Sequence, residues 1–196
     1  MNESELQSRL DFVRRAEQLK DTLRSGYTSA GRTESVADHT WRLTLLVMTF
    51  ADMLPDVNLL RLLKICVLHD LGEAVDGDIP APLQVGQASK SDKERSDFQS
   101  LLQGLPASLQ AEFLDLWDDY EFAQSEEAKV AKGLDKIETL MQHNQGSNPP
   151  DFDYAFNLDY GRQHTDAVAL TANIRRLLDA QTRVKANNSA RPNGQS

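Results

Sequence analysis

The sequence has one cysteine, Cys66, so it cannot form a disulfide within the chain. It has no apolar run that approaches the ~18 residues a membrane-spanning helix needs. Its first ten residues, MNESELQSRL, are polar and lack the apolar region of a signal peptide. We therefore expect a cytoplasmic protein in a reducing compartment, without a membrane partner.

Basic side chains are also scarce. The chain has 21 Lys and Arg against 30 Asp and Glu, which gives a formal net charge of -9 at pH 7. Because DNA and RNA are bound through a basic face, we expect no nucleic-acid polymer as a partner. A small phosphorylated ligand is still compatible with this charge, since a bound metal ion can neutralise its phosphate.

The chain shows little of the alternating pattern of β-strands and no internal repeat. Its 196 residues suit a single domain with a sizeable core. We expect an all-α fold, a compact multi-helix bundle over residues 1–185, followed by a disordered tail at 186–196.

The predicted helices cover residues 4–24, 36–54, 58–72, 92–103, 107–122, 126–143 and 160–185. The first of them carries an apolar stripe at Leu6, Leu10, Val13, Leu19 and Leu23. Residues 24–35 are rich in Gly, Ser and Thr and predict a loop, and residues 83–91 predict a mobile loop. The N-caps expected for the second and third helices are Ser35 or Thr33, and Asn58.

The segment from Leu68 to Pro82, LHDLGEAVDGDIPAP, places carboxylates and a histidine directly after an apolar helix, LLRLLKICVL. Ionised groups at the end of a buried segment are costly unless they are paired or bind a metal. His69 and Asp70 are adjacent, and imidazole and carboxylate together suit several divalent metals. Glu73, four residues after His69, faces the same side, where a carboxylate can take a proton from water.

Further metal ligands must come from elsewhere in the chain. His39 lies in the first turn of an apolar helix, and Asp135 borders the buried stripe of a later one. The spacing alone favours a solvated side chain at Asp135, so its role as a ligand stays open at this point. His143 and His164 lie among polar residues near helix ends and predict solvated surface histidines.

Four other residues have ordinary structural interpretations. Asp76 is expected to be a turn residue, and Cys66 a small core residue rather than a nucleophile. Trp41 is expected to pack in the core, and its neighbour Arg42 to form a surface or interface salt bridge.

His39, the pair His69–Asp70 and the distant Asp135 resemble the H…HD…D signature of the HD-domain metal phosphohydrolases. The segments RTESVADHTWR, LHDLGEAVDGDIPAP and AKGLDKIETL are similar to the HD-domain 5'-deoxynucleotidase family. The likeness extends over roughly residues 15–145. It implies an HD-domain bundle, a nucleotide substrate and a homodimer, because members of the family are commonly dimers.

The resemblance also implies a role for each matching residue. His39, His69, Asp70 and Asp135 would bind one divalent metal ion, whose identity among Mn, Co, Fe, Mg, Ni and Zn the sequence does not determine. Glu73 would help to activate the attacking water, and Asp78 would contact the sugar or assist that water. Arg24 would bind the phosphate. Tyr27, which stands where the family often has Trp, would stack on the base.

We therefore predict metal-dependent hydrolysis of (deoxy)nucleoside 5'-monophosphates to nucleoside and phosphate. The first alternative is a phosphodiesterase or pyrophosphohydrolase on the same scaffold, since HD domains support several hydrolyses. The second is a nucleotide-binding module without catalysis, which would be expected to lack a metal ligand or Glu73. All of these residues are present.

Overall fold

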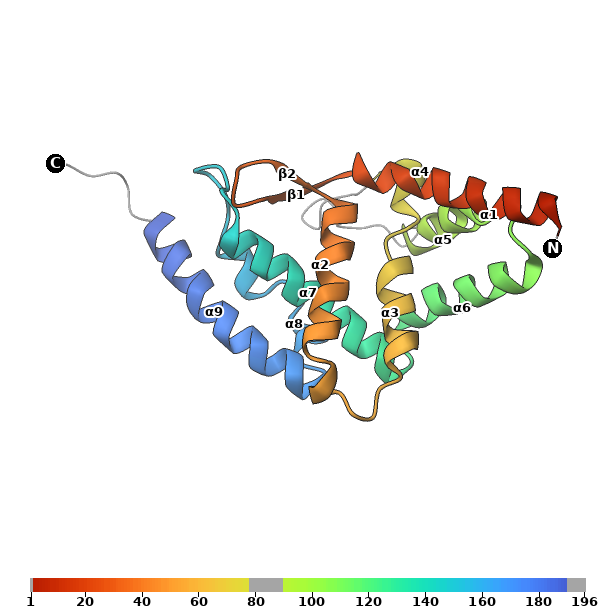
Figure 1. The fold of residues 1–196 in the computed structure, drawn as a ribbon. Coiled ribbons are helices and arrows are strands. Elements are labelled where there is room, and N and C mark those ends of the chain that lie inside the picture. Colours follow the sequence, from red (N-terminus) through yellow and green to blue (C-terminus); the bar gives the residue numbers. More distant parts are fainter. Residues whose placement is uncertain (1, 78–89, 190–196) are drawn as a thin grey trace.

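The computed structural model describes residues 2–77 and 90–189, and in this part of the chain helices predominate (Figure 1). The elements, in order, are α1 (Glu3–Ala16), a 3-10 turn (Glu17–Lys20), β1 (Leu23–Tyr27), β2 (Thr33–Ser35), α2 (Val36–Thr49), a 3-10 turn (Ala51–Met53), α3 (Leu59–Leu68), α4 (Glu73–Asp76), α5 (Lys90–Leu101), α6 (Ala107–Phe122), α7 (Glu126–Gln145), a 3-10 turn (Phe156–Leu158), α8 (Arg162–Thr165) and α9 (Ala169–Ser189). The predicted all-α class is confirmed.

Helix α7 is the centre of the fold, and α2, α3, α6, α8 and α9 pack against it. Its apolar residues Leu134, Ile137 and Leu140 are fully buried. The helix begins where the Ser125 side chain accepts a hydrogen bond from the backbone N–H of Ala128. Because α7 is surrounded on several sides, any polar side chain in its middle must find a partner within the protein.

The predicted caps of α2 and α3 are confirmed. Ser35 forms a capping box with Asp38 at the start of α2, and Asn58 accepts a hydrogen bond from Arg61 N at the start of α3. These caps fix where each helix begins, and therefore which way its first side chains face.

The predicted loop at 24–35 was wrong, because residues 23–35 form an antiparallel hairpin of β1 and β2. The turn contains Gly31 at φ 84, a backbone conformation that favours glycine. The hairpin also pairs with other parts of the chain: Ser147 N donates to Thr28 O over 3.0 Å, and the side chain of Gln142 donates to Tyr27 O. Contacts so distant in sequence leave no local pattern.

Several predicted helix boundaries also differ from the structure. The first helix ends at Ala16, and its stripe at Leu6, Leu10 and Val13 is exposed rather than part of the core. The predicted helix 160–185 is divided into α8 and α9, and α9 continues to Ser189 through the first four residues of the predicted tail.

Two expectations concern residues outside the described part of the chain. They are most of the mobile loop predicted at 83–91 and residues 190–196 of the tail. Among the described residues, no helix is both long enough and apolar enough to cross a membrane.

Candidate metal centre

Four side chains predicted as metal ligands lie together where α2, α3 and α7 meet. His39 is in the first turn of α2, His69 is the C-cap of α3 and is followed by Asp70, and Asp135 lies in the middle of α7. His69 Nε2 is 3.0 Å from Asp70 Oδ2, and His39 Nε2 is 3.1 Å from Asp135 Oδ1 and 3.8 Å from Asp70 Oδ2. These three distances connect all four side chains, with His39 and Asp70 each in contact with two of the others.

The geometry of these atoms fits a divalent metal ion. Ligand atoms about 2.1 Å from a first-row metal lie roughly 3 to 4 Å from one another. The ligand atoms of His39, His69 and Asp70 all lie within 4.8 Å of one another, and Asp135 joins this group through the 3.1 Å between its Oδ1 and His39 Nε2. The Nε2 atoms of His39 and His69 are buried, and within the described structure neither makes a hydrogen bond of acceptable geometry. Buried nitrogens without hydrogen bonds are costly, and coordination of a metal removes that cost.

The opposite nitrogen of each imidazole is held by the protein. His69 Nδ1 lies 2.8 Å from the backbone oxygen of Cys66, and His39 Nδ1 contacts Glu138 Oε2. An Nδ1–H that donates to an oxygen leaves Nε2 as the metal-facing nitrogen. Both rings are therefore oriented for coordination through Nε2.

Sequence reasoning missed Glu138, which is fully buried on α7. It lies three residues after Asp135 and therefore on the same side of the helix, a signal that could have identified it. Its second oxygen accepts a 2.6 Å hydrogen bond from Arg42 Nε. Arg42 thus forms an ion pair, as expected, but with a buried partner, whereas its neighbour Trp41 is 65% exposed and not in the core as predicted.

The charges of the cluster depend strongly on one another. Burial raises the pKa of Asp135, but Lys136 and His39 outweigh it and hold that pKa well below its usual range. Burial and Arg24 lower the pKa of His39, whereas Glu138 and Asp135 raise it further, to about 10. The carboxylates of Glu138 and Asp135 thus favour positive charge at His39, and a metal ion bound through Nε2 would supply that charge in place of a proton.

Arg24 extends from β1 toward the same centre. Its Nη1 is 3.4 Å from Asp70 Oδ2, its Nη2 donates to Thr139 Oγ1 over 3.2 Å, and its Nε is 3.4 Å from Glu34 Oε2. Burial raises the pKa of Glu34 to about 7, although Arg24 opposes this shift. The hairpin missed from sequence is therefore what places a guanidinium beside the metal ligands.

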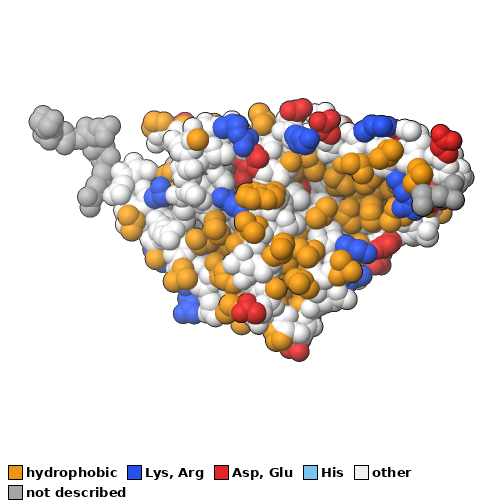
Figure 2. Space-filling model, viewed as in Figure 1, with side chains coloured by type: hydrophobic (Ala, Val, Ile, Leu, Met, Phe, Trp, Pro, Cys, Tyr) orange, Lys and Arg blue, Asp and Glu red, His pale blue; other side chains and the backbone are white. Residues whose placement is uncertain are grey.

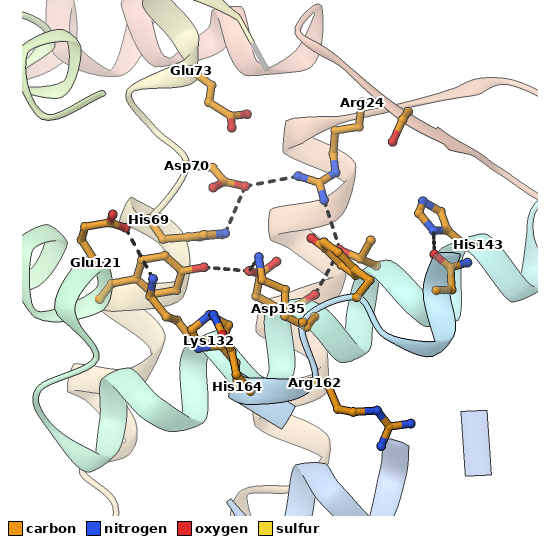
Figure 3. A pocket seen from close by; sticks show the side chains of 18 of the residues that line it. Arg24, His69, Asp70, Glu73, Glu121, Lys132, Asp135, His143, Arg162 and His164 are labelled. Atoms are coloured by element: carbon orange, nitrogen blue, oxygen red, sulfur yellow. Dashed lines mark hydrogen bonds and ion pairs between the residues drawn. The ribbon is translucent and has the colours of Figure 1, made fainter. Parts of the chain in front are cut away.

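Glu73 lines the same cavity from the first residue of α4, as Figure 3 shows beside Asp70. The helix predicted over 58–72 in fact ends at Leu68, so Glu73 reaches this side through a turn and not along one continuous helix. An added Cβ at Gly72 would lie 3.0 Å from the backbone oxygen of Glu94. The glycine lets α4 approach α5 closely, which sets the position of Glu73.

The two other predicted substrate residues are not brought to this centre by the described structure. Tyr27 is half-buried at the end of β1 and is absent from the residues that line the cavity. Asp78 lies outside the described residues. Asp76, expected as a turn residue, is the last residue of α4 and pairs with Lys93.

The centre opens into a cavity of about 910 Å³. The wall opposite α3 and α4 is formed by residues 152–164, with the rings of Phe152, Phe156 and Tyr160. His143, predicted to be a solvated surface residue, is buried and hydrogen-bonded to Asn157. His164, predicted likewise, is half-buried and lines the cavity. The polarity of their sequence neighbours concealed this packing.

Comparison with known proteins points to one family. A family model described as "HD domain" matches residues 16–175. The chain is 34% identical over 140 residues to a human protein named 5'-deoxynucleotidase HDDC2. The aligned residues make up 70% of this chain and 68% of the human protein. It is 37% identical over 148 residues to 5'-deoxynucleotidase hdd1 of Schizosaccharomyces pombe, covering 72% of this chain and 74% of the relative.

Solved structures agree with these sequence matches. A crystal structure described as a predicted metal-dependent phosphohydrolase, from Magnetospirillum magnetotacticum, superposes with a TM-score of 0.80 at 26% identity and covers 94% of this chain and 98% of that one. A conserved hypothetical protein from Pyrococcus furiosus has a TM-score of 0.62 at 23% identity over 89% of this chain and 99% of that one, and shows the fold alone.

Proposed function

Because this chain belongs to the HD-domain family, we propose that it hydrolyses deoxynucleoside 5'-monophosphates to deoxynucleoside and inorganic phosphate. The observation that carries the proposal is the cluster of His39, His69, Asp70 and Asp135 at the base of a cavity, with Arg24 beside it. The relatives named 5'-deoxynucleotidase support the substrate class.

One divalent ion is proposed for the four ligands. When bound, it would act as a Lewis acid on the phosphoryl group and increase the acidity of a water molecule. Two imidazoles and two carboxylates accept Mn, Co, Fe, Mg, Ni or Zn, and availability as well as affinity decides among them.

The chain's own residues would then carry out the proton and charge transfers. Glu73 takes a proton from the attacking water, whose oxygen forms a new bond to phosphorus while the bond to the 5'-oxygen of the sugar breaks. The departing 5'-oxygen receives the proton that Glu73 has taken from the water, which leaves the nucleoside and inorganic phosphate. Arg24 donates hydrogen bonds to the phosphate, where a guanidinium fits two oxygens at once.

We propose two further residues for recognition of the sugar and the base. Asp78, which the described residues do not include, is proposed to contact the sugar near its 3'-hydroxyl, where a 2'-hydroxyl would crowd it. Tyr27, at the end of β1, is proposed to stack on the base. Equal turnover of AMP and dAMP would contradict the proposed sugar preference.

The decisive experiment measures phosphate release from dAMP, AMP, a 3'-monophosphate and a phosphate diester. Chelator-treated protein is supplied with Mn²⁺, Co²⁺ or Mg²⁺ separately. We expect metal-dependent release confined to the 5'-deoxynucleotide. Cleavage of the diester alone would indicate a phosphodiesterase, and no release by folded, metal-loaded protein would contradict a hydrolytic function.

We also propose a homodimer that forms through α2 and α3. Trp41, Leu45 and Met48 lie on one side of α2 and are exposed, as are Leu60 and Val67 on α3. Figure 2 shows hydrophobic side chains spread over this face of the molecule. Exposed apolar faces of this kind mark interaction surfaces, and two copies can cover them symmetrically.

A cytoplasmic location is likewise a proposal. Fractionation of cells that express the tagged protein tests it, and recovery in a membrane or extracellular fraction would contradict it.

A further inference from the structure

Lys136 lies beside one of the proposed metal ligands. It follows Asp135 on α7, and its Nζ is 2.8 Å from Asp135 Oδ2. Tyr120 donates a 2.7 Å hydrogen bond to the same oxygen. Two donors therefore hold Oδ2, which leaves Oδ1, 3.1 Å from His39 Nε2, as the oxygen that faces the centre.

The side chain of Lys136 is held tightly along its length. Gly161 has a φ of 64, and an added Cβ there would lie only 2.6 Å from Lys136 Cγ. The Tyr160 ring lies under the ammonium, with its centroid 5.5 Å from Nζ. The buried Arg175 donates a 2.8 Å hydrogen bond to Tyr160 O and so fixes this part of the wall. The ammonium is therefore directed by packing and not only by its ion pair.

Other cations that line the cavity are directed elsewhere. Lys132 lies 3.4 Å from Glu121, and Arg162 donates to Asp179 over 2.8 Å. Among the described cations that line the cavity, the two that form ion pairs with proposed ligands are Arg24, with Asp70, and Lys136, with Asp135. The Lys136 side chain is 23% exposed, and Lys136 is one of the residues that line the cavity.

The charge of a phosphate explains why two cations would flank the centre. Two ligand carboxylates already balance a divalent ion, so the dianionic substrate needs positive charge from other groups. Lys136 lines the cavity next to a ligand carboxylate, so its ammonium can reach a phosphoryl oxygen that enters the cavity on that side, and such charged hydrogen bonds are short and strong. Arg24 provides one such donor on the β1 side of the centre, and Lys136 provides one on the α7 side.

We propose that Lys136 is a catalytic residue that donates a hydrogen bond to the phosphoryl group of the substrate. It stabilises the charge that develops on the phosphoryl oxygens while the bond to the leaving oxygen breaks. This inference rests on the proposed phosphohydrolase function. It adds to the phosphate-binding residues one that is not among the four proposed metal ligands.

Binding of inorganic phosphate to the Mn²⁺-loaded protein, measured by calorimetry, tests the inference without turnover. Lys136→Gln should weaken phosphate binding by about tenfold or more, because a charged hydrogen bond is lost. Lys136→Arg, which keeps the charge, should recover part of that loss. Mn²⁺ affinity, measured by competition with a chelator, should stay within about twofold.

Two further variants separate this role from general damage. Lys129→Gln removes a lysine from the same helix that pairs with Glu126 at 2.6 Å, and phosphate binding should be unchanged. Gly161→Ala should weaken phosphate binding in the same direction as Lys136→Gln, since the new methyl group displaces the lysine. The double variant should be no worse than Lys136→Gln alone.

Three results of these measurements would overturn the inference, and a fourth would separate it from the proposed function. A parallel loss of Mn²⁺ affinity in Lys136→Gln would show that the lysine only holds Asp135. Unchanged phosphate binding, or wild-type protein that binds no phosphate, would exclude the contact. If wild-type protein binds phosphate through Lys136 but hydrolyses no nucleotide, the proposed function fails while the contact stands.

Discussion

Glu138 places a negative charge behind His39, on the side of the ring away from the metal centre. Burial raises the pKa of Glu138, but His39 and Arg42 outweigh it and keep that pKa below its usual value. Glu138 therefore stays ionised, fixes the ring through Nδ1 and increases the basicity of Nε2.

Glu138→Gln should weaken metal binding by about 10- to 100-fold, because the neutral amide orients and polarises the imidazole less. Chelator competition measures the affinity. Glu126→Gln, at an exposed residue in the first turn of α7, is the matched control and should bind metal normally. Unchanged affinity in Glu138→Gln would show that the carboxylate serves only to pair with Arg42.

Glu73 lines the cavity without belonging to the ligand set, so its removal should separate catalysis from metal binding. Glu73→Ala should keep metal affinity within about twofold and lower kcat by about 10²- to 10⁴-fold. Asp70→Ala should lose metal and activity together. Near-normal turnover in Glu73→Ala would contradict its role as the base.

At the scale of elements, Asp119 joins α6 to α3 and α7. Its carboxylate accepts hydrogen bonds from Ser125 N over 2.8 Å, from Ser125 Oγ over 2.6 Å and from Arg61 Nη2 over 2.7 Å. Asp119→Ala should reduce the free energy of unfolding by about 2 to 4 kcal/mol, because a buried charged network and the support of a helix cap are lost. Urea denaturation measures the loss.

The comparison of the wild type with Asp119→Ala also predicts a dependence on pH. Burial raises the pKa of Asp119, but Ser125 and Arg61 outweigh it and lower that pKa below 3.8. The stabilisation is therefore present above the unfolded pKa and is lost as the pH falls through the folded pKa. The difference in the free energy of unfolding between the wild type and Asp119→Ala should therefore shrink below about pH 4. Asp115→Ala, which removes an exposed partner of Arg61, should cost under about 0.5 kcal/mol.

The elements that sequence predicted well are those whose signals are local. Helices α6 and α7 combine long apolar periodicity with clear boundaries, and the caps at Ser35 and Asn58 are short-range hydrogen bonds. The hairpin was missed because much of its support comes from Gln142 and Ser147, more than a hundred residues away. Because the hairpin was not predicted, the sequence did not show how Arg24 reaches the metal centre.

At the scale of the whole molecule, three helices are tied together at the metal centre, so a bound ion should stabilise the fold. A metal at 100 times its dissociation constant contributes about 2.7 kcal/mol, or roughly 5 to 10 °C in Tm for a domain of this size. Chelation should lower Tm by that amount, and the restored metal should reverse it. In Asp70→Ala the same treatment should leave Tm unchanged.

The proposed dimer makes a separate prediction at this scale. Met48→Glu introduces a charge on a side chain that is 63% exposed in the single chain, so folding should be unaffected while association is lost. Light scattering coupled to gel filtration should report a dimer for the wild type and a monomer for the variant. Leu177→Glu, at an exposed apolar residue on α9, should remain dimeric. A monomeric wild type would contradict the proposal.

The sequence by itself determined the helical class, the apolar cores of the main helices and the candidates His39, His69, Asp70 and Asp135. Local periodicity and the distinctive motifs carry that information within short segments. Only the tertiary structure decided that Glu138 supports His39, that His143 is buried, and that the hairpin directs Arg24 to the ligands. Burial and pairing at these positions depend on contacts with helices distant in sequence, and local sequence patterns do not determine such contacts.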